Sequence, residues 1–144
     1  MPFDPQVITT TSTALTLARK THNGTVLLIN TNSSGTSTFT LPTASGSGAK
    51  FRIVNNVQQT QGTLVITGTT GDTLVGKALM FDSTAAADAL IFMTTATTIK
   101  TTWNRTTQGG LGYDEMEAID VAANVYEVVV TCNGSGSIVT PFSA

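Results

Sequence analysis

The chain has few charged residues, a single cysteine and a single histidine. Only 11% of the 144 residues are charged and the net charge is −2, so we expect no electrostatic attraction to nucleic acid or to anionic membranes. The lone Cys132 excludes an intrachain disulfide and a cysteine metal cluster. No apolar run approaches the roughly 20 residues of a membrane span, and the opening MPFDPQVI is too polar for a signal peptide. These features predict a protein made soluble in a cytosol.

Threonine is abundant in this weakly charged chain and accounts for 29 of the 144 residues. Threonine is β-branched and favours pleated, half-exposed surfaces, so its abundance favours sheet over helix. Turn signals such as Asn23-Gly24 separate about nine or ten short strand-like segments. The sequence therefore predicts an all-β protein with one β-sandwich or jelly-roll-like domain over residues 7–144. Two prolines in residues 1–6 predict a short extended N-terminal arm.

The stretch from Ser45 to Lys50, SGSGAK, raises the question of a phosphate-binding loop. Such a loop needs a glycine before the lysine and a Ser or Thr after it, followed by a helix. Here Ala49 precedes Lys50 and Phe51 follows, and the next residues alternate as a strand. The segment is thus predicted to be a flexible hairpin loop between two strands.

Four acids close to the C-terminus are the best candidates for chemistry: Asp114, Glu115, Glu117 and Asp120. Paired carboxylates serve as the acid and nucleophile of glycosidases, and several together bind calcium. On a strand, Glu115 and Glu117 share one face at about 7 Å, which suits paired carboxylates. The chain nevertheless lacks the order of an EF-hand, so we favour a solvated charge patch on a strand edge.

The remaining side chains with functional potential have simpler interpretations. His22 directly precedes the Asn23-Gly24 turn, where we expect a solvated loop histidine without a catalytic role. Trp103 and Tyr126 are predicted to pack in the core, although with Tyr113 they would also make a platform for sugars or bases. Cys132 is expected to be a small buried residue. No catalytic, cofactor-binding or metal-binding residue is predicted.

The order of several phrases along the chain resembles the small head decoration (cement) proteins of tailed bacteriophages. The phrase TLPTASGSGAKF, from Thr40 to Phe51, leads into a strand, and GTLVITG follows it. Near the end, an acidic and apolar strand precedes a strand with an aromatic residue, and Gly134 to Phe142 gives the terminal pattern Gly-x-Gly-x-x-x-T-P-F. The resemblance covers most of the chain from about Gly24 onward.

This resemblance implies a non-enzymatic structural protein of the virion. It implies a homotrimer on the capsid exterior, made in the host bacterial cytoplasm, that binds the major capsid protein at local threefold positions and stabilises the head. The arm residues Pro2, Phe3, Asp4 and Pro5 are predicted to contact a neighbouring subunit or the shell. The alternative is a tail- or fibre-associated module that binds a receptor or carbohydrate. A glycan-cleaving enzyme using Glu115 or Glu117 ranks well below both.

Overall fold

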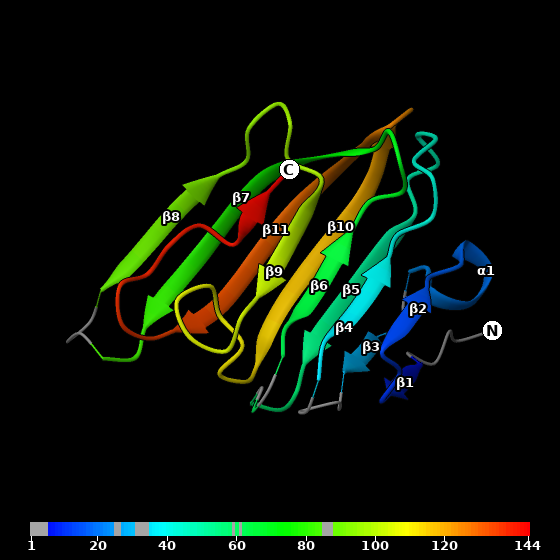
Figure 1. Cartoon of the computed structure of the whole chain (residues 1–144). Coiled ribbons are helices and arrows are strands. Elements are labelled where there is room, and N and C mark those ends of the chain that lie inside the picture. Colours follow the sequence, from blue (N-terminus) through cyan, green and yellow to red (C-terminus); the bar gives the residue numbers. More distant parts are fainter. Residues whose placement is uncertain (1–5, 25–26, 31–34, 59, 61, 85–87) are drawn as a thin grey trace.

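The computed structural model confirms an all-β protein built from two mixed sheets (Figure 1). It describes residues 6–24, 27–30, 35–58, 60, 62–84 and 88–144. The only helix of this part of the chain is the four-residue α1 (Arg19–His22). The high threonine content and the short alternating segments are the physical reason for this class, because they suit pleated sheets better than helices.

The larger sheet contains seven strands. In spatial order they are β1 (Val7–Thr10), β3 (Leu27–Asn30), β5 (Lys50–Asn55), β10 (Asp114–Ala122), β11 (Val125–Gly134), β7 (Thr73–Asp82) and β8 (Ala89–Met93). The smaller sheet contains β12 (Phe142–Ser143), β9 (Lys100–Trp103), β6 (Leu64–Thr67), β4 (Ser37–Thr40) and β2 (Ala14–Thr16). Strands β1 and β8 are therefore the two edges of the larger sheet.

The first six strands alternate between the two sheets. β1, β3 and β5 lie side by side and parallel in the larger sheet, and β2, β4 and β6 do the same in the smaller one. Each parallel connection thus passes through the opposite sheet and needs no helical crossover. β11 also pairs in parallel with β7, while β10 pairs antiparallel with both β5 and β11. This mixed pairing is more varied than the antiparallel order of a jelly roll.

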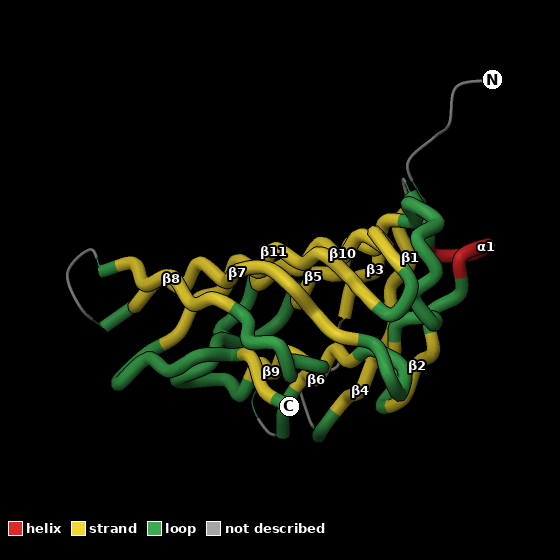
Figure 2. Tube along the Cα trace, turned by 90° about the horizontal axis from the view of Figure 1, so that it is seen from above, coloured by secondary structure: helices red, strands yellow, loops and turns green. Residues whose placement is uncertain are grey.

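The hydrophobic core lies between the two layers, which Figure 2 shows edge-on. Phe39 of β4 and Trp103 of β9 reach it from the smaller sheet, and Phe51 of β5 and Tyr126 of β11 from the larger one. The rings of Phe51 and Tyr126 meet edge to face, with centroids 6.2 Å apart. The predicted core positions of Trp103 and Tyr126 are confirmed.

Residues 7–18 form two strands in different sheets, β1 and β2, because the chain crosses between layers at residues 11–13. One local prediction was wrong. The loop from Ser45 to Lys50 is not a hairpin, since β4 and β5 belong to different sheets. It is an arch that connects the layers, and its context is indeed that of a turn without a helix.

Candidate interaction surface

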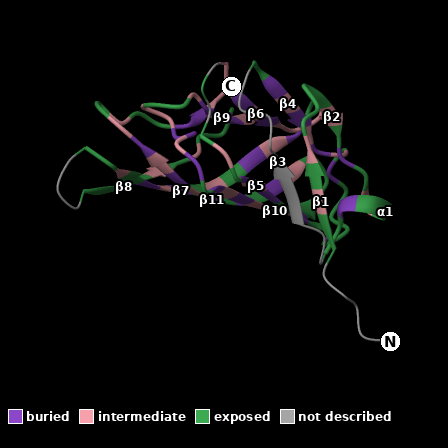
Figure 3. Ribbon diagram, turned by 90° about the horizontal axis from the view of Figure 1, so that it is seen from below, coloured by how far each residue is buried: buried purple, intermediate pink, exposed green. Residues whose placement is uncertain are grey.

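The predicted contact residues Pro2, Phe3, Asp4 and Pro5 lie outside the residues that the structure describes. The most unusual feature of the described part is strand β8, the last strand of the larger sheet. Its sequence ALIFM is wholly apolar, yet four of its five residues are exposed and Phe92 is half-buried (Figure 3).

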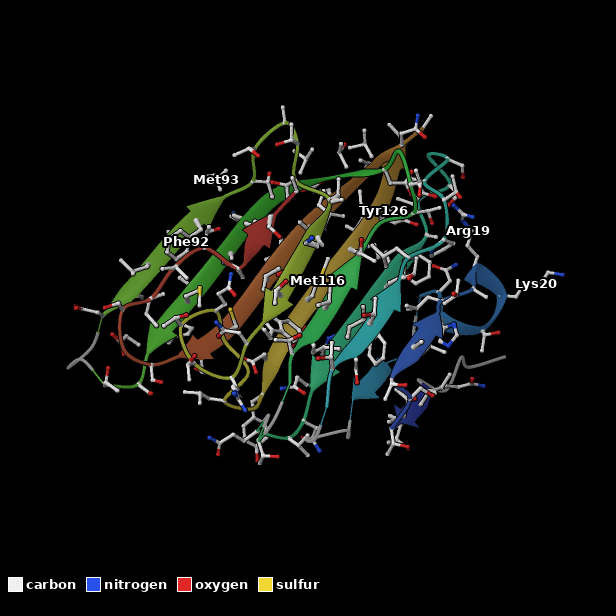
Figure 4. The ribbon with its side chains drawn as sticks, in the orientation of Figure 1. Arg19, Lys20, Phe92, Met93, Met116 and Tyr126 are labelled. Carbon is white, nitrogen blue, oxygen red and sulfur yellow. The ribbon has the colours of Figure 1, made fainter. Side chains whose placement is uncertain are left out.

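Strand β8 is exposed on both of its faces and along one backbone edge. It pairs only with β7, so its outer N–H and C=O groups face away from the sheet. Ile91 and Met93 are 67% and 66% exposed on one face, and Leu90 is 43% exposed on the other. Figure 4 shows Phe92 and Met93 on this strand, far from α1. Native proteins usually protect such edges with charge, proline or a covering element, and β8 has neither charge nor proline.

The apolar surface continues from β8 onto the next two strands. Cross-strand register places Leu79 opposite Ile91, and Lys77 opposite both Met93 and Val129. We call this surface the outer patch and define it by the outward-facing apolar residues of three strands: Val75, Leu79 and Phe81 of β7, Ile91 and Met93 of β8, and Val129 of β11. Contiguous exposed apolar patches of this kind mark protein interaction sites.

Charged side chains bound the outer patch on the side toward the middle of the sheet. Glu127 of β11 and Glu117 of β10 lie on the same outer face. Beyond them the Arg52 guanidinium and the Glu115 carboxylate form a two-point ion pair, with N···O distances of 2.6 and 3.0 Å. An apolar area next to a polar border is the usual anatomy of a protein interface.

The acids of β10 do not form the predicted solvated strand edge, and that prediction was wrong. β10 lies in the interior of the sheet between β5 and β11. Only Glu115 and Glu117 face outward, whereas Asp114 and Asp120 are fully buried on the inner side. Asp114 and Asp120 alternate along β10 with the same spacing as the apolar Met116 and Ala118, so all four share one face of the strand. This alternation was visible in the sequence.

Asp120 is held by the arch that contains the SGSGAK sequence. Its two carboxylate oxygens accept hydrogen bonds from the backbone N–H groups of Ser45 and Gly46, at 2.8 and 2.6 Å, and from the Ser47 hydroxyl at 2.6 Å. Arg19 completes the shell with an ion pair at 2.7 Å. Burial alone raises the pKa of Asp120, but the hydrogen bonds outweigh it and hold that pKa well below its usual range. The arch does bind an anion, and the anion is a side chain of the same chain.

Asp114 stabilises the opposite end of β10. Its carboxylate accepts hydrogen bonds from the backbone N–H groups of Gly110, Gly112 and Asn133, and from the Asn55 side-chain amide. Burial raises the pKa of Asp114, and these hydrogen bonds only partly oppose the increase. Both buried acids are thus satisfied by internal donors and serve the fold.

The other candidates are also accounted for by packing. His22 is buried and accepts a hydrogen bond from the Ala18 N–H at Nδ1, so the predicted solvated histidine was wrong. The Tyr126 hydroxyl donates to the Pro42 carbonyl at 2.6 Å, and burial raises its pKa to about 12. Cys132 is buried as predicted. Tyr113 differs from the other two aromatic candidates because it is 79% exposed.

In comparisons with known proteins, no family model, curated protein or solved structure matches the chain. In the part that the structure describes, no three His, Cys, Asp or Glu side chains gather in a way that would hold a metal ion. No helix of that part is long and apolar enough to cross a membrane. The surface feature that remains to be explained is the outer patch with its open edge, and its chemistry suits binding to another protein.

Proposed function

We propose that the chain is a structural protein of a virion, a head decoration protein that binds the capsid exterior as a homotrimer and stabilises the shell. The observation that carries this proposal is the exposed apolar strand β8 at the edge of the larger sheet. A strand that is apolar on both faces is costly to leave in water, at roughly 25 cal/mol per Å² of apolar surface. Assembly on a shell or with other copies would remove that cost.

The rest of the surface also supports a role in assembly. Only 11% of the residues are charged and the net charge is −2, so the long-range charge attraction used to steer ligands is weak. Binding through several copies at once compensates for weak individual contacts, because linked sites raise apparent affinity by roughly 10²–10⁴. A trimer of a β-sandwich or jelly-roll-like subunit on a shell with repeated sites has this property.

The test is co-sedimentation of the purified protein with matured, undecorated heads of the phage that carries its gene. We expect saturable binding at a fixed number of copies per head. Ile91→Lys places a charge in the outer patch and should weaken binding at least about tenfold. Val139→Lys is the matched control, since Val139 is an exposed valine outside the outer patch, and it should bind like the wild type. Wild-type protein that never sediments with heads would contradict the proposal.

A second candidate is the receptor- or carbohydrate-binding module, favoured by the exposed ring of Tyr113. This residue has a positive φ of 60° immediately before β10, and its ring is 79% exposed. Exposed aromatic rings are common contact points for sugars, which stack on their faces. This candidate predicts binding to host cells that Tyr113→Ala abolishes, together with no binding to heads.

A further inference from the structure

The outer patch contains a hollow of about 240 Å³ between β7, β8 and β11. Leu79, Ile91 and Val129 give it apolar walls, and Lys77 and Thr131 complete the lining. The two ion pairs of the described residues are Arg19–Asp120 and Arg52–Glu115, so neither includes Lys77. The hollow therefore suits an apolar side chain that is accompanied by a negative charge.

One segment of this chain has that chemistry in its sequence. Phe3 is followed directly by Asp4, and Pro2 and Pro5 flank the pair. The other aromatic-Asp steps are part of the folded body: Phe81-Asp82 in β7, and Tyr113-Asp114 at the start of β10. We propose that Phe3 of one copy inserts into the hollow of a second copy, where Asp4 pairs with Lys77.

The same chain cannot fill its own hollow, because the distance is too large. The register of the larger sheet places Val7 and Lys77 in one row across the strands. β1 and β7 are separated by five strand spacings, or about 24 Å at about 4.8 Å each. Phe3 precedes Val7 by four residues, which span at most about 14 Å. The gap of about 10 Å that remains to Lys77 exceeds the length of a phenylalanine side chain, so Phe3 of the same chain does not reach the β7 and β8 side of the hollow.

The resulting contact is head-to-tail. It joins the β1 side of one subunit to the β8 side of the next, and repetition of such a heterologous contact closes into a ring or continues as an open chain. This inference rests on the proposed homotrimer and identifies the contact that would close it. The two prolines beside Phe3 reduce the conformational entropy lost when the segment binds.

The direct test is cysteine cross-linking between two variants in solution, without heads. Phe3→Cys protein is mixed with Ile91→Cys protein of a distinguishable mass, under mild oxidation. We expect a disulfide-linked dimer that contains one chain of each kind. Each variant alone should give little dimer, and the buried Cys132 should not interfere. A link within one chain of the Phe3→Cys, Ile91→Cys double variant, or no mixed dimer, would overturn the inference.

Charge exchange tests the proposed pair of Asp4 and Lys77. Lys77→Glu and Asp4→Lys should each raise the concentration at which the oligomer dissociates by at least about tenfold, measured by light scattering. The combined Asp4→Lys, Lys77→Glu variant should restore assembly. If the combined variant is as weak as either single one, the pairing is wrong.

Binding experiments with undecorated heads distinguish a failure of the subunit contact from a failure of the proposed function. Wild-type protein that saturates heads but gives no mixed disulfide would leave the decoration role in place and overturn the subunit contact. Loss of head binding by Phe3→Ala without any change in solution mass would place the arm on the shell, which also overturns the contact between copies.

Discussion

Arg19 and Asp120, which are 101 residues apart in the sequence, form an ion pair at 2.7 Å that links the start of α1 to the end of β10. The Asp120 side chain is fully buried, whereas the Arg19 side chain is 34% exposed. The arch from Ser45 to Ser47 surrounds the same carboxylate. One buried acid thus connects α1, the crossing between the sheets and the central strand of the larger sheet.

We predict that Asp120→Ala is among the most destabilising single substitutions. It leaves the N–H groups of Ser45 and Gly46 without their acceptor and the partly exposed Arg19 without its partner, and each buried donor without an acceptor costs about 1–3 kcal/mol. Denaturant unfolding measures this cost. Arg52→Ala is the control, because it removes an exposed pair with Glu115 and should cost only about 0–1 kcal/mol. Equal effects of the two substitutions would contradict the role assigned to Asp120.

Stability should depend on pH in opposite ways through the two buried acids of β10. The pKa of Asp120 lies below the ordinary value of about 3.9, so the unfolded chain binds more protons between these values. The Asp120 contribution to the free energy of unfolding is therefore complete above about pH 4 and is lost as the pH falls below it. The pKa of Asp114 is raised, so its contribution falls as the pH increases from about 4 through the raised value.

Denaturant unfolding of the wild type, Asp114→Asn and Asp120→Asn between about pH 2.5 and about pH 7 tests this dependence. The difference between wild type and Asp120→Asn should shrink as the pH falls below about 4. The difference between wild type and Asp114→Asn should shrink as the pH rises above about 4. Differences that stay constant over the whole range would show that neither acid has a shifted pKa.

Gly76 should tolerate no side chain. A Cβ atom at this position would lie 1.9 Å from the Val128 carbonyl oxygen of the paired strand β11. Gly76→Ala must therefore push β7 away from β11, and we expect a loss of at least about 3 kcal/mol in the free energy of unfolding, or no folded protein. Gly136→Ala is the comparison, since Gly136 has a positive φ but open space around it, and should cost about 1 kcal/mol. Thermal unfolding followed by circular dichroism distinguishes the two.

Cys132 should be unreactive in the folded protein. Burial raises the pKa of its thiol above the ordinary value, and the nearby Asp114 charge adds to the increase. A thiol reagent at about pH 8 should therefore modify the folded protein far more slowly than the protein unfolded in denaturant. Rapid modification under native conditions would show that this end of β11 opens readily.

The strand segments could be predicted from the sequence, but their partners could not. The sequence predicts strands where β10 and β11 lie, but the burial of Asp114 and Asp120 on the inner face of β10 was missed. Alternation does not say which strand lies beside which, so the central position of β10 was missed. The Arg19–Asp120 pair was also out of reach, since it depends on how the chain crosses between the sheets.

Strand β8 shows a different kind of disagreement. Five apolar residues in a row are typical of a strand buried on both faces, and the structure leaves this strand at an open edge. The apolar sequence of β8 thus conflicts with its exposed position in the single chain. Conflicts of this kind are concentrated at functional sites. A covering partner, as in the proposed function, would resolve the conflict at β8.

Hydrogen exchange of the Ala89–Met93 amides tests the central claim most directly. The rates are compared for dilute protein, concentrated protein and protein bound to undecorated heads. If β8 is a binding edge, its outward-facing amides exchange rapidly in dilute protein and at least about tenfold more slowly in one of the two assembled states. Identical exchange of this strand in all three states would contradict the assignment of β8 as an interaction surface.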